Sequence, residues 1–180
     1  MKEEDSEWFS RAVSARDGTE APEVIALIEG MDAAKDNFLF DAVETVGFAM
    51  LTSERLLWGV RVGDNLQGFK GFIHGGIIAT LMDQSMGNLL FLLLRTGYFA
   101  KEYGEKALPT TKKSLNFATL SLNIKYFRPA RVNSLLLFDS IVTDVQPKRV
   151  ALKTQLFDEN DVLQSESEVV FARKNWNPKL

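Results

Sequence analysis

The sequence contains no cysteine. This absence excludes disulfide frameworks, thiol nucleophiles and zinc sites built on sulfur. The chain also has a single histidine, His74, so one chain cannot form a metal site with several histidine ligands. A Ser-His-Asp hydrolase would have to use His74, and no G-x-S-x-G elbow accompanies it. These absences remove most hydrolase chemistries, and we expect neither a metal nor a redox cofactor.

Strong charge of one sign is missing as well. The 180 residues carry 21 Lys and Arg against 24 Asp and Glu, a net charge of −3. This balance gives no general attraction to nucleic acid or to an anionic membrane, so any basic ligand site must be local. The acidic start MKEEDSEWFS has no apolar signal region. We therefore expect an intracellular protein, cytoplasmic or in the mitochondrial matrix, and not a secreted one.

The longest apolar stretch, residues 77–94, is interrupted by Asp83, Gln84 and Asn88. A carboxylate near the middle of a membrane span costs roughly 2.5–3.5 kcal/mol on insertion scales. Apolar residues recur here at spacings of three and four, and most other faces are apolar too. The pattern predicts a helix over about 75–94 that is buried on several sides and does not span a membrane.

The N-terminal part predicts two short helices, over 3–16 and 22–30. We assign residues 1–50 to an N-terminal helical arm and 51–176 to the main domain. The pattern ERLLWGVRV (residues 54–62) indicates the first strand of a sheet.

After the helix, the polar stretch 95–115 predicts a long excursion. Alternating apolar and polar residues then predict four consecutive antiparallel strands, at about 120–126, 135–145, 150–157 and 162–172. A helix buried on several sides beside such a meander implies a sheet wrapped round it, an α+β arrangement.

Asp83 is the first candidate for chemistry. Burial of an unpaired carboxylate is unfavourable and raises its pKa, and perturbed carboxylates concentrate at functional sites. The structural alternative is a carboxylate that caps a loop or pairs with an arginine. The helix alone leaves both interpretations open.

The start of the same helix is the second candidate. Gly75 and Gly76 leave backbone N–H groups unobstructed there, and the helix dipole favours negative charge. A thioester carbonyl that becomes an oxyanion would be stabilised at this point, although two glycines also suit a tight turn. Asp83 lies about two helical turns further on the same face, so we expect one acyl group to meet both. His74 could donate a hydrogen bond to a carbonyl as a neutral imidazole, or simply cap the helix.

The run GFIHGGIIATLMDQSMG (residues 71–87) resembles the H-G-G-x₆-D signature of the PaaI-like hot-dog thioesterases. The run TLSLNIKYFRP (residues 119–129) resembles a strand motif, T-x-x-L-N-I-x-Y-x-R-P, of the acyl-CoA thioesterase branch that includes the animal thioesterase superfamily enzymes. The resemblance covers roughly residues 54–173. It implies a hot-dog fold, in which an antiparallel sheet wraps round a long central helix.

The resemblance also implies roles for single residues. Asp83 matches the catalytic aspartate, acting as general base or as nucleophile. His74, Gly75 and Gly76 match the groups that polarise the thioester carbonyl. Thr119 matches a threonine that helps to position water, commonly across a subunit interface. The family implies a homodimer or a dimer of dimers, with the sites between subunits.

The implied reaction is hydrolysis of acyl-CoA, of medium or long acyl chain, to a free acid and coenzyme A. Coenzyme A enters only as part of the substrate, and its phosphates call for local cations. Arg128, Lys125 and Arg131 at a strand end are the predicted contacts, with solvated charges as the alternative. Two other functions stay open: a non-catalytic acyl-CoA-binding sensor, and a hot-dog hydratase or dehydratase.

Overall fold

The computed structural model of the chain describes residues 3–17, 43–52, 54–98, 117–146 and 148–173. The helices and strands are, in chain order, α1 (Glu3–Asp17), β1 (Val43–Thr52), β2 (Arg55–Val62), the 3-10 turn η3 (Asp64–Leu66), β3 (Gln67–Phe69), β4 (Phe72–Ile73), α2 (Gly75–Arg95), β5 (Phe117–Tyr126), β6 (Leu135–Gln146), β7 (Arg149–Asp158) and β8 (Leu163–Arg173).

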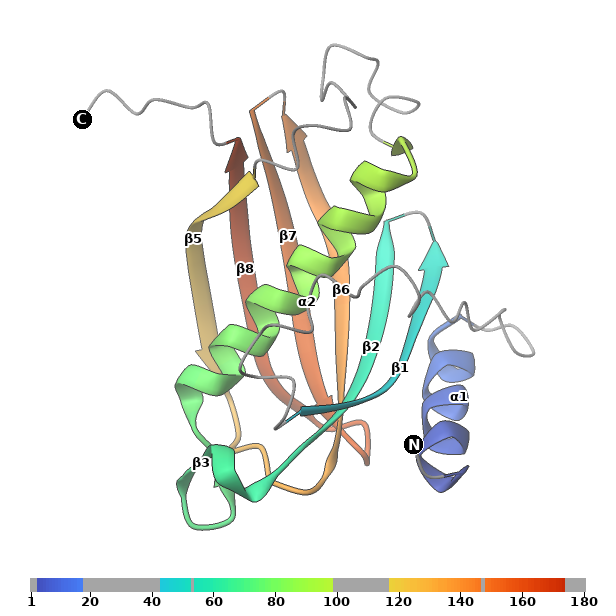
Figure 1. Cartoon of the computed structure of the whole chain (residues 1–180), viewed down its shortest axis with the longest axis vertical. Coiled ribbons are helices and arrows are strands. Elements are labelled where there is room, and N and C mark those ends of the chain that lie inside the picture. The colour runs from blue at the N-terminus through green and yellow to red at the C-terminus, as the bar shows by residue number, and fades with distance from the viewer. Residues whose placement is uncertain (1–2, 18–42, 53, 99–116, 147, 174–180) are drawn as a thin grey trace.

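Six strands form one antiparallel sheet in the order β1-β2-β6-β7-β8-β5. Helix α2 crosses one face of this sheet diagonally (Figure 1), and β3 and β4 form a small separate hairpin before it. Strand β5 pairs only with β8 among the described strands and is therefore an edge strand. The predicted α+β arrangement, a long central helix on an antiparallel sheet, is confirmed.

The main core lies between α2 and the sheet. Trp58 of β2 stacks on Phe48 of β1, with ring centroids 5.6 Å apart, and Phe138 of β6 lies 5.3 Å from Trp58. The fully buried side chains of α2 that fill this core are Leu81, Met82, Met86, Leu89 and Leu93. Because these residues recur at spacings of three and four, one broad side of α2 is buried, while Thr80, Asp83 and Gly87 follow a partly open side.

Helix α1 covers the opposite face of the sheet at its β1–β2 end. The Phe9 ring, 2% exposed, lies over the cross-strand pair Gly47 and Gly59, where an added Cβ would come within 2.6 Å of it. Asp5 accepts a hydrogen bond of 2.6 Å from Arg61, and Arg16 lies 3.4 Å from Asp139. The N-terminal helix thus packs on the domain through apolar and ionic contacts.

Three details differ from the sequence expectations. Strand β5 was expected to open the meander beside β6, but it pairs with β8, at the other end of the meander. Strand β1 precedes the strand expected to be first and runs across the assigned boundary between residues 50 and 51. Strand β5 is mostly exposed and not half-buried, because it lies at the sheet edge. The helix predicted over 22–30 and most of the excursion predicted over 95–115 lie outside the described residues.

Candidate functional site

Asp83 and Thr119 meet where the open side of α2 faces β5. The Thr119 hydroxyl lies 3.0 Å from one carboxylate oxygen of Asp83 and 3.2 Å from the other. A register shift in β5 after Thr119 makes this contact possible. Such a bulge lets Thr119 and Tyr126, an odd and an even position of one strand, both reach α2. The two hydrogen bonds link the edge strand to the helix.

Burial raises the pKa of the Asp83 carboxyl above its ordinary value of 3.8, and the hydrogen bond from Thr119 acts in the opposite direction. Loss of hydration disfavours the charged carboxylate, whereas a donor to that carboxylate favours it. Once ionised, a carboxylate with a raised pKa is a stronger base than an ordinary aspartate. This suits a group that takes a proton from water.

The start of α2 is capped by His74. The imidazole Nδ1 accepts a hydrogen bond of 3.0 Å from the Gly76 N–H, and the His74 carbonyl accepts from Ile77 and Ile78. No acceptor for the Gly75 N–H lies among the residues that the structure describes. Since Nδ1 is an acceptor, the proton of the neutral ring is on Nε2. The helix start therefore presents two donors, the Gly75 N–H and His74 Nε2–H.

The β3–β4 hairpin packs closely against His74. The His74 N–H donates to the Leu66 carbonyl at 3.0 Å. A Cβ added to Gly68 would lie 3.0 Å from both Cα and Cδ2 of His74. This close approach explains the glycine and restricts the imidazole from one side.

Asp83 and Gly75 are separated along the helix. Eight residues at the ideal helical rise give about 12 Å between them. A general base and an oxyanion donor must each lie within about 3 Å of the group on which they act. The Asp83 side chain leans toward the start of the helix, which shortens its distance to the Gly75 N–H by only part of this length. Whether one acyl group meets both groups within one chain therefore depends on how far the Asp83 side chain reaches, and our sequence-based expectation stays a prediction.

Two of the three predicted phosphate contacts lie near the helix start. Arg131 is exposed, and its guanidinium lies 5.5 Å from the centre of the Phe72 ring, two residues before His74. Arg128 follows Tyr126, which bonds the first residue of α2, and donates to the Leu163 carbonyl at 3.1 Å.

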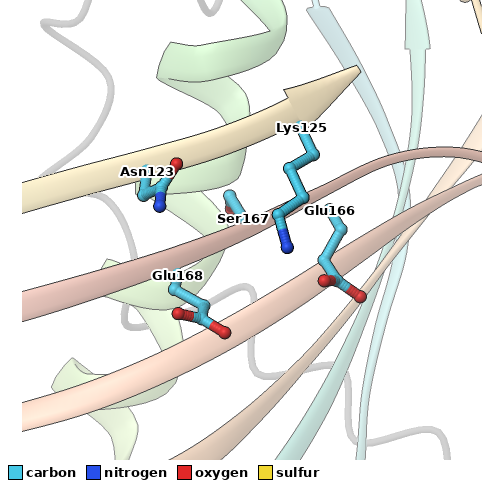
Figure 2. Close-up of a pocket in the computed structure, with 5 residues that line it drawn as sticks. All are labelled: Asn123, Lys125, Glu166, Ser167 and Glu168. Atoms are coloured by element: carbon cyan, nitrogen blue, oxygen red, sulfur yellow. The ribbon is translucent and has the colours of Figure 1, made fainter. Parts of the chain in front are cut away.

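Lys125 lies on the other face of the sheet. Figure 2 shows it on β5 with Asn123, beside Glu166 and Glu168 of β8, with α2 on the far side of the strands. Glu166 also forms an ion pair of 2.7 Å with Lys153, and this contact is the main reason why its pKa lies below the ordinary value. The fold does not bring Lys125 to the Asp83 of its own chain.

Sequence reasoning missed Tyr126. Its hydroxyl donates to the Gly75 carbonyl at 2.8 Å, and its ring lies 3.7 Å from where a Gly75 Cβ would be. The signal was present, since Tyr126 belongs to the strand motif, but we counted it only as an apolar position in the alternating pattern of that strand.

Within the described ranges, no group of three or more histidine, aspartate or glutamate residues is arranged to hold a metal. Helix α2 is long and apolar enough to cross a membrane by length and composition, but it is the core helix and 56% of its most apolar window is buried inside the protein.

A family model described as the thioesterase superfamily matches residues 70–165, more than half of the chain. A comparison with curated proteins gave no significant match. Among solved structures, the chain is similar to a hypothetical thioesterase protein from Streptococcus pneumoniae with coenzyme A, at 14% identity and a TM-score of 0.57 over 74% of this chain and 90% of that one.

Two further structures give a similar result. A Streptococcus mutans protein bound to acetyl-CoA is 19% identical, with a TM-score of 0.54 over 74% of this chain and 90% of that one. Zebrafish thioesterase superfamily member 2 is 17% identical, with a TM-score of 0.57 over 78% of this chain and 91% of that one. At such low sequence identities the structural similarities show the fold alone, and that fold is the predicted hot-dog fold. Together with the match of the family model, they show that the chain belongs to the thioesterase superfamily.

Proposed function

We propose that this protein hydrolyses acyl-CoA thioesters to a free acid and coenzyme A. The observation that carries the proposal is the contact between Thr119 and the partly buried Asp83, in a chain of the thioesterase superfamily. A base with a raised pKa activates water, and the donors at the start of α2 suit a carbonyl oxygen that gains negative charge.

The proposed reaction begins with the thioester carbonyl at the helix start. The Gly75 N–H and His74 Nε2–H donate to its oxygen. Asp83 takes a proton from water, whose oxygen attacks the carbonyl carbon, and the thiolate of coenzyme A leaves and is protonated. The alternative is attack by Asp83 itself to form an acyl-enzyme anhydride. Oxygen-18 water in a single turnover separates the two, because only the anhydride route puts the label into Asp83.

We assign the two halves of each site to two copies of the chain. The separation of about 12 Å along α2 is long for one chain to place both groups on one carbonyl. In a dimer with twofold symmetry, helices that run antiparallel past each other bring Gly75 of one copy to Asp83 of the other. The active form is then a homodimer or a dimer of dimers.

Strand β5 supports this assembly. It is an edge strand with a free hydrogen-bonding edge among the described strands, and it exposes Leu120 (44%) and Leu122 (36%), with Phe127 (51%) exposed just beyond its end. Exposed apolar side chains on an unpaired edge strand favour pairing with another strand. Pairing of β5 with its copy would place Thr119 and Asp83 beside the second subunit.

Coenzyme A is the proposed carrier group because similar folds bind coenzyme A or acetyl-CoA. Arg128 and Arg131 lie at the helix-start end of the site and are the proposed phosphate contacts of the same chain. Lys125, on the outer face, could reach only the site of another copy. We place the chain in the PaaI-like branch and its substrates among medium- to long-chain acyl-CoAs.

The decisive experiment measures release of free thiol from acyl-CoAs of increasing chain length, for the wild type and for Asp83→Asn. We expect turnover by the wild type and a loss of about 10²- to 10⁴-fold in the folded variant. Binding of acyl-CoA without thiol release would reject the hydrolase and favour a sensor. Hydration of an enoyl-CoA without thiol release would indicate a hydratase.

A further inference from the structure

One peptide unit at the start of α2 is held at both ends. The carbonyl oxygen of Gly75 accepts the Tyr126 hydroxyl at 2.8 Å, and the N–H of the same peptide, on Gly76, donates to His74 Nδ1 at 3.0 Å. The peptide bond is trans, so the two bonds leave it on opposite sides. Tyr126 and His74 are thus connected through a single rigid plane.

A donor at the carbonyl oxygen polarises a peptide and makes its N–H a better donor, since hydrogen bonds in a chain strengthen one another. The Tyr126 hydroxyl therefore strengthens the bond from the Gly76 N–H to His74. That bond needs a lone pair on Nδ1, and it keeps the proton of the neutral ring on Nε2. It also fixes the direction in which Nε2–H points.

We infer that Tyr126 is a positioning residue, which acts through the Gly75–Gly76 peptide to hold the single histidine in the tautomer and orientation that donate to the substrate carbonyl. The inference rests on the proposed function, because it assigns a carbonyl to His74 Nε2–H. It adds a second residue of the edge strand, besides Thr119, to a site otherwise built from α2 and its N-cap His74.

The surroundings of Tyr126 fit this role. Its ring lies 3.7 Å from where a Gly75 Cβ would be, so the phenol packs beside the peptide that it bonds. Its hydroxyl is protonated and able to donate at neutral pH, since the ordinary tyrosine pKa is 10.0 and burial raises the pKa of Tyr126 further. Thr119, on the same strand, bonds Asp83. One strand therefore positions both functional ends of the open side of α2.

Tyr126→Phe tests the inference, because it removes the hydroxyl and keeps the ring. The matched control is Tyr98→Phe, which removes another hydrogen-bonded tyrosine hydroxyl, the donor to Glu54, just beyond the far end of α2. We expect kcat to fall about tenfold in Tyr126→Phe, less than for loss of a direct oxyanion donor, with KM within about twofold. Tyr98→Phe should keep the kcat of the wild type.

The single histidine permits a second readout that does not depend on turnover. Labelling with ¹⁵N-histidine gives the two ring nitrogens of His74 alone. In the wild type at a pH where the ring is neutral, we expect a protonated Nε2 and an unprotonated Nδ1 with well-separated shifts. In Tyr126→Phe the two shifts should move toward each other, as the ring exchanges between tautomers.

The outcomes are distinguishable. Unchanged His74 shifts in Tyr126→Phe overturn the inference, and so does a fall in kcat that Tyr98→Phe reproduces. A wild type that releases no thiol rejects the proposed function. If the shifts still move in Tyr126→Phe alone, the link from Tyr126 to His74 stands as a property of the helix start.

Discussion

The hydroxyl of Thr119 bridges both oxygens of the Asp83 carboxylate, at 3.0 and 3.2 Å. A single donor thereby offsets part of the effect of burial, which raises the pKa of this carboxyl. The contact links β5 to α2 and lowers the basicity that burial gives to the group that we propose as general base.

Thr119→Val should move the pH dependence of hydrolysis. The hydrogen bond lowers the pKa of Asp83, so its removal raises that pKa further, and the acid limb of kcat/KM should shift to higher pH. Thr119→Ser keeps a hydroxyl and should keep the limb of the wild type. An acid limb that does not move in Thr119→Val would mean that another group titrates.

Asp83→Asn should be more stable than the wild type at neutral pH. Because the folded pKa lies above 3.8, the native state holds this proton more tightly than the unfolded chain does. Its stability therefore falls as pH rises from about 3.8 through the raised pKa, and asparagine avoids that loss. The gap between the two urea midpoints should open as pH rises through this window and then level off.

Glu166→Gln is a control for which we expect a stability change of the opposite sign to that of Asp83→Asn. The pKa of Glu166 is lowered, mainly by its hydrogen bond with Lys153, so the glutamate stabilises the fold above its ordinary value of 4.5 and loses this effect as pH falls. The variant should be less stable than the wild type at neutral pH, with the difference vanishing in acid. The same sign for both variants would contradict the assignment of these two shifts.

Because the Phe9 ring packs directly on Gly59, we expect substitutions of these two residues to have coupled effects on stability. Loss of the buried ring in Phe9→Ala should lower the free energy of unfolding by about 3 kcal/mol. Gly59→Ala should cost about 1–3 kcal/mol, because its Cβ would lie 2.6 Å from that ring. In the Phe9→Ala background the Gly59 substitution should cost at least about 1 kcal/mol less. If the two substitutions have additive effects on the free energy of unfolding in urea, the Phe9 ring of α1 does not pack on Gly59.

The sequence predicted α2 almost to the residue, because an apolar pattern at helical spacing and the flanking glycines both act locally. The strands of the meander were also placed within a few residues. Strand β1 was not predicted, since its apolar residues are buried on both faces, one face in the cluster with Phe9 of α1 and the other in the main core, and the resulting pattern does not alternate. Coverage by a helix distant in sequence leaves no local signal.

In the candidate site, too, the residues with a local sequence signal could be predicted and a contact fixed by the tertiary structure could not. Asp83 and the helix start were visible as a carboxylate within an apolar helix and two glycines at its beginning. The contact with Thr119 was not derivable from alternation, which put Thr119 on the opposite face from Tyr126. The bulge after Thr119 reverses the alternation, and only the three-dimensional register reveals it.

The proposal that two chains share each site can be tested with Gly75→Pro. Proline fits the first helical position, its ring removes only the Gly75 N–H, and the extended backbone of His74 suits a following proline. Gly75→Pro and Asp83→Asn should each be nearly inactive as homodimers. If sites are shared, the purified heterodimer of these two variants contains one intact site and should recover about half of the wild-type turnover.

The reciprocal heterodimer pairs the wild type with the double variant that carries both substitutions. Under a shared arrangement, each of its sites contains one altered group, so it should be nearly inactive. Under an arrangement within one chain, the wild-type subunit keeps a complete site and the heterodimer should retain about half of the turnover. The two heterodimers thus give opposite results under the two arrangements. Activity in the second and none in the first would place Gly75 and Asp83 of one chain at the same carbonyl, against the separation of about 12 Å that the helix imposes.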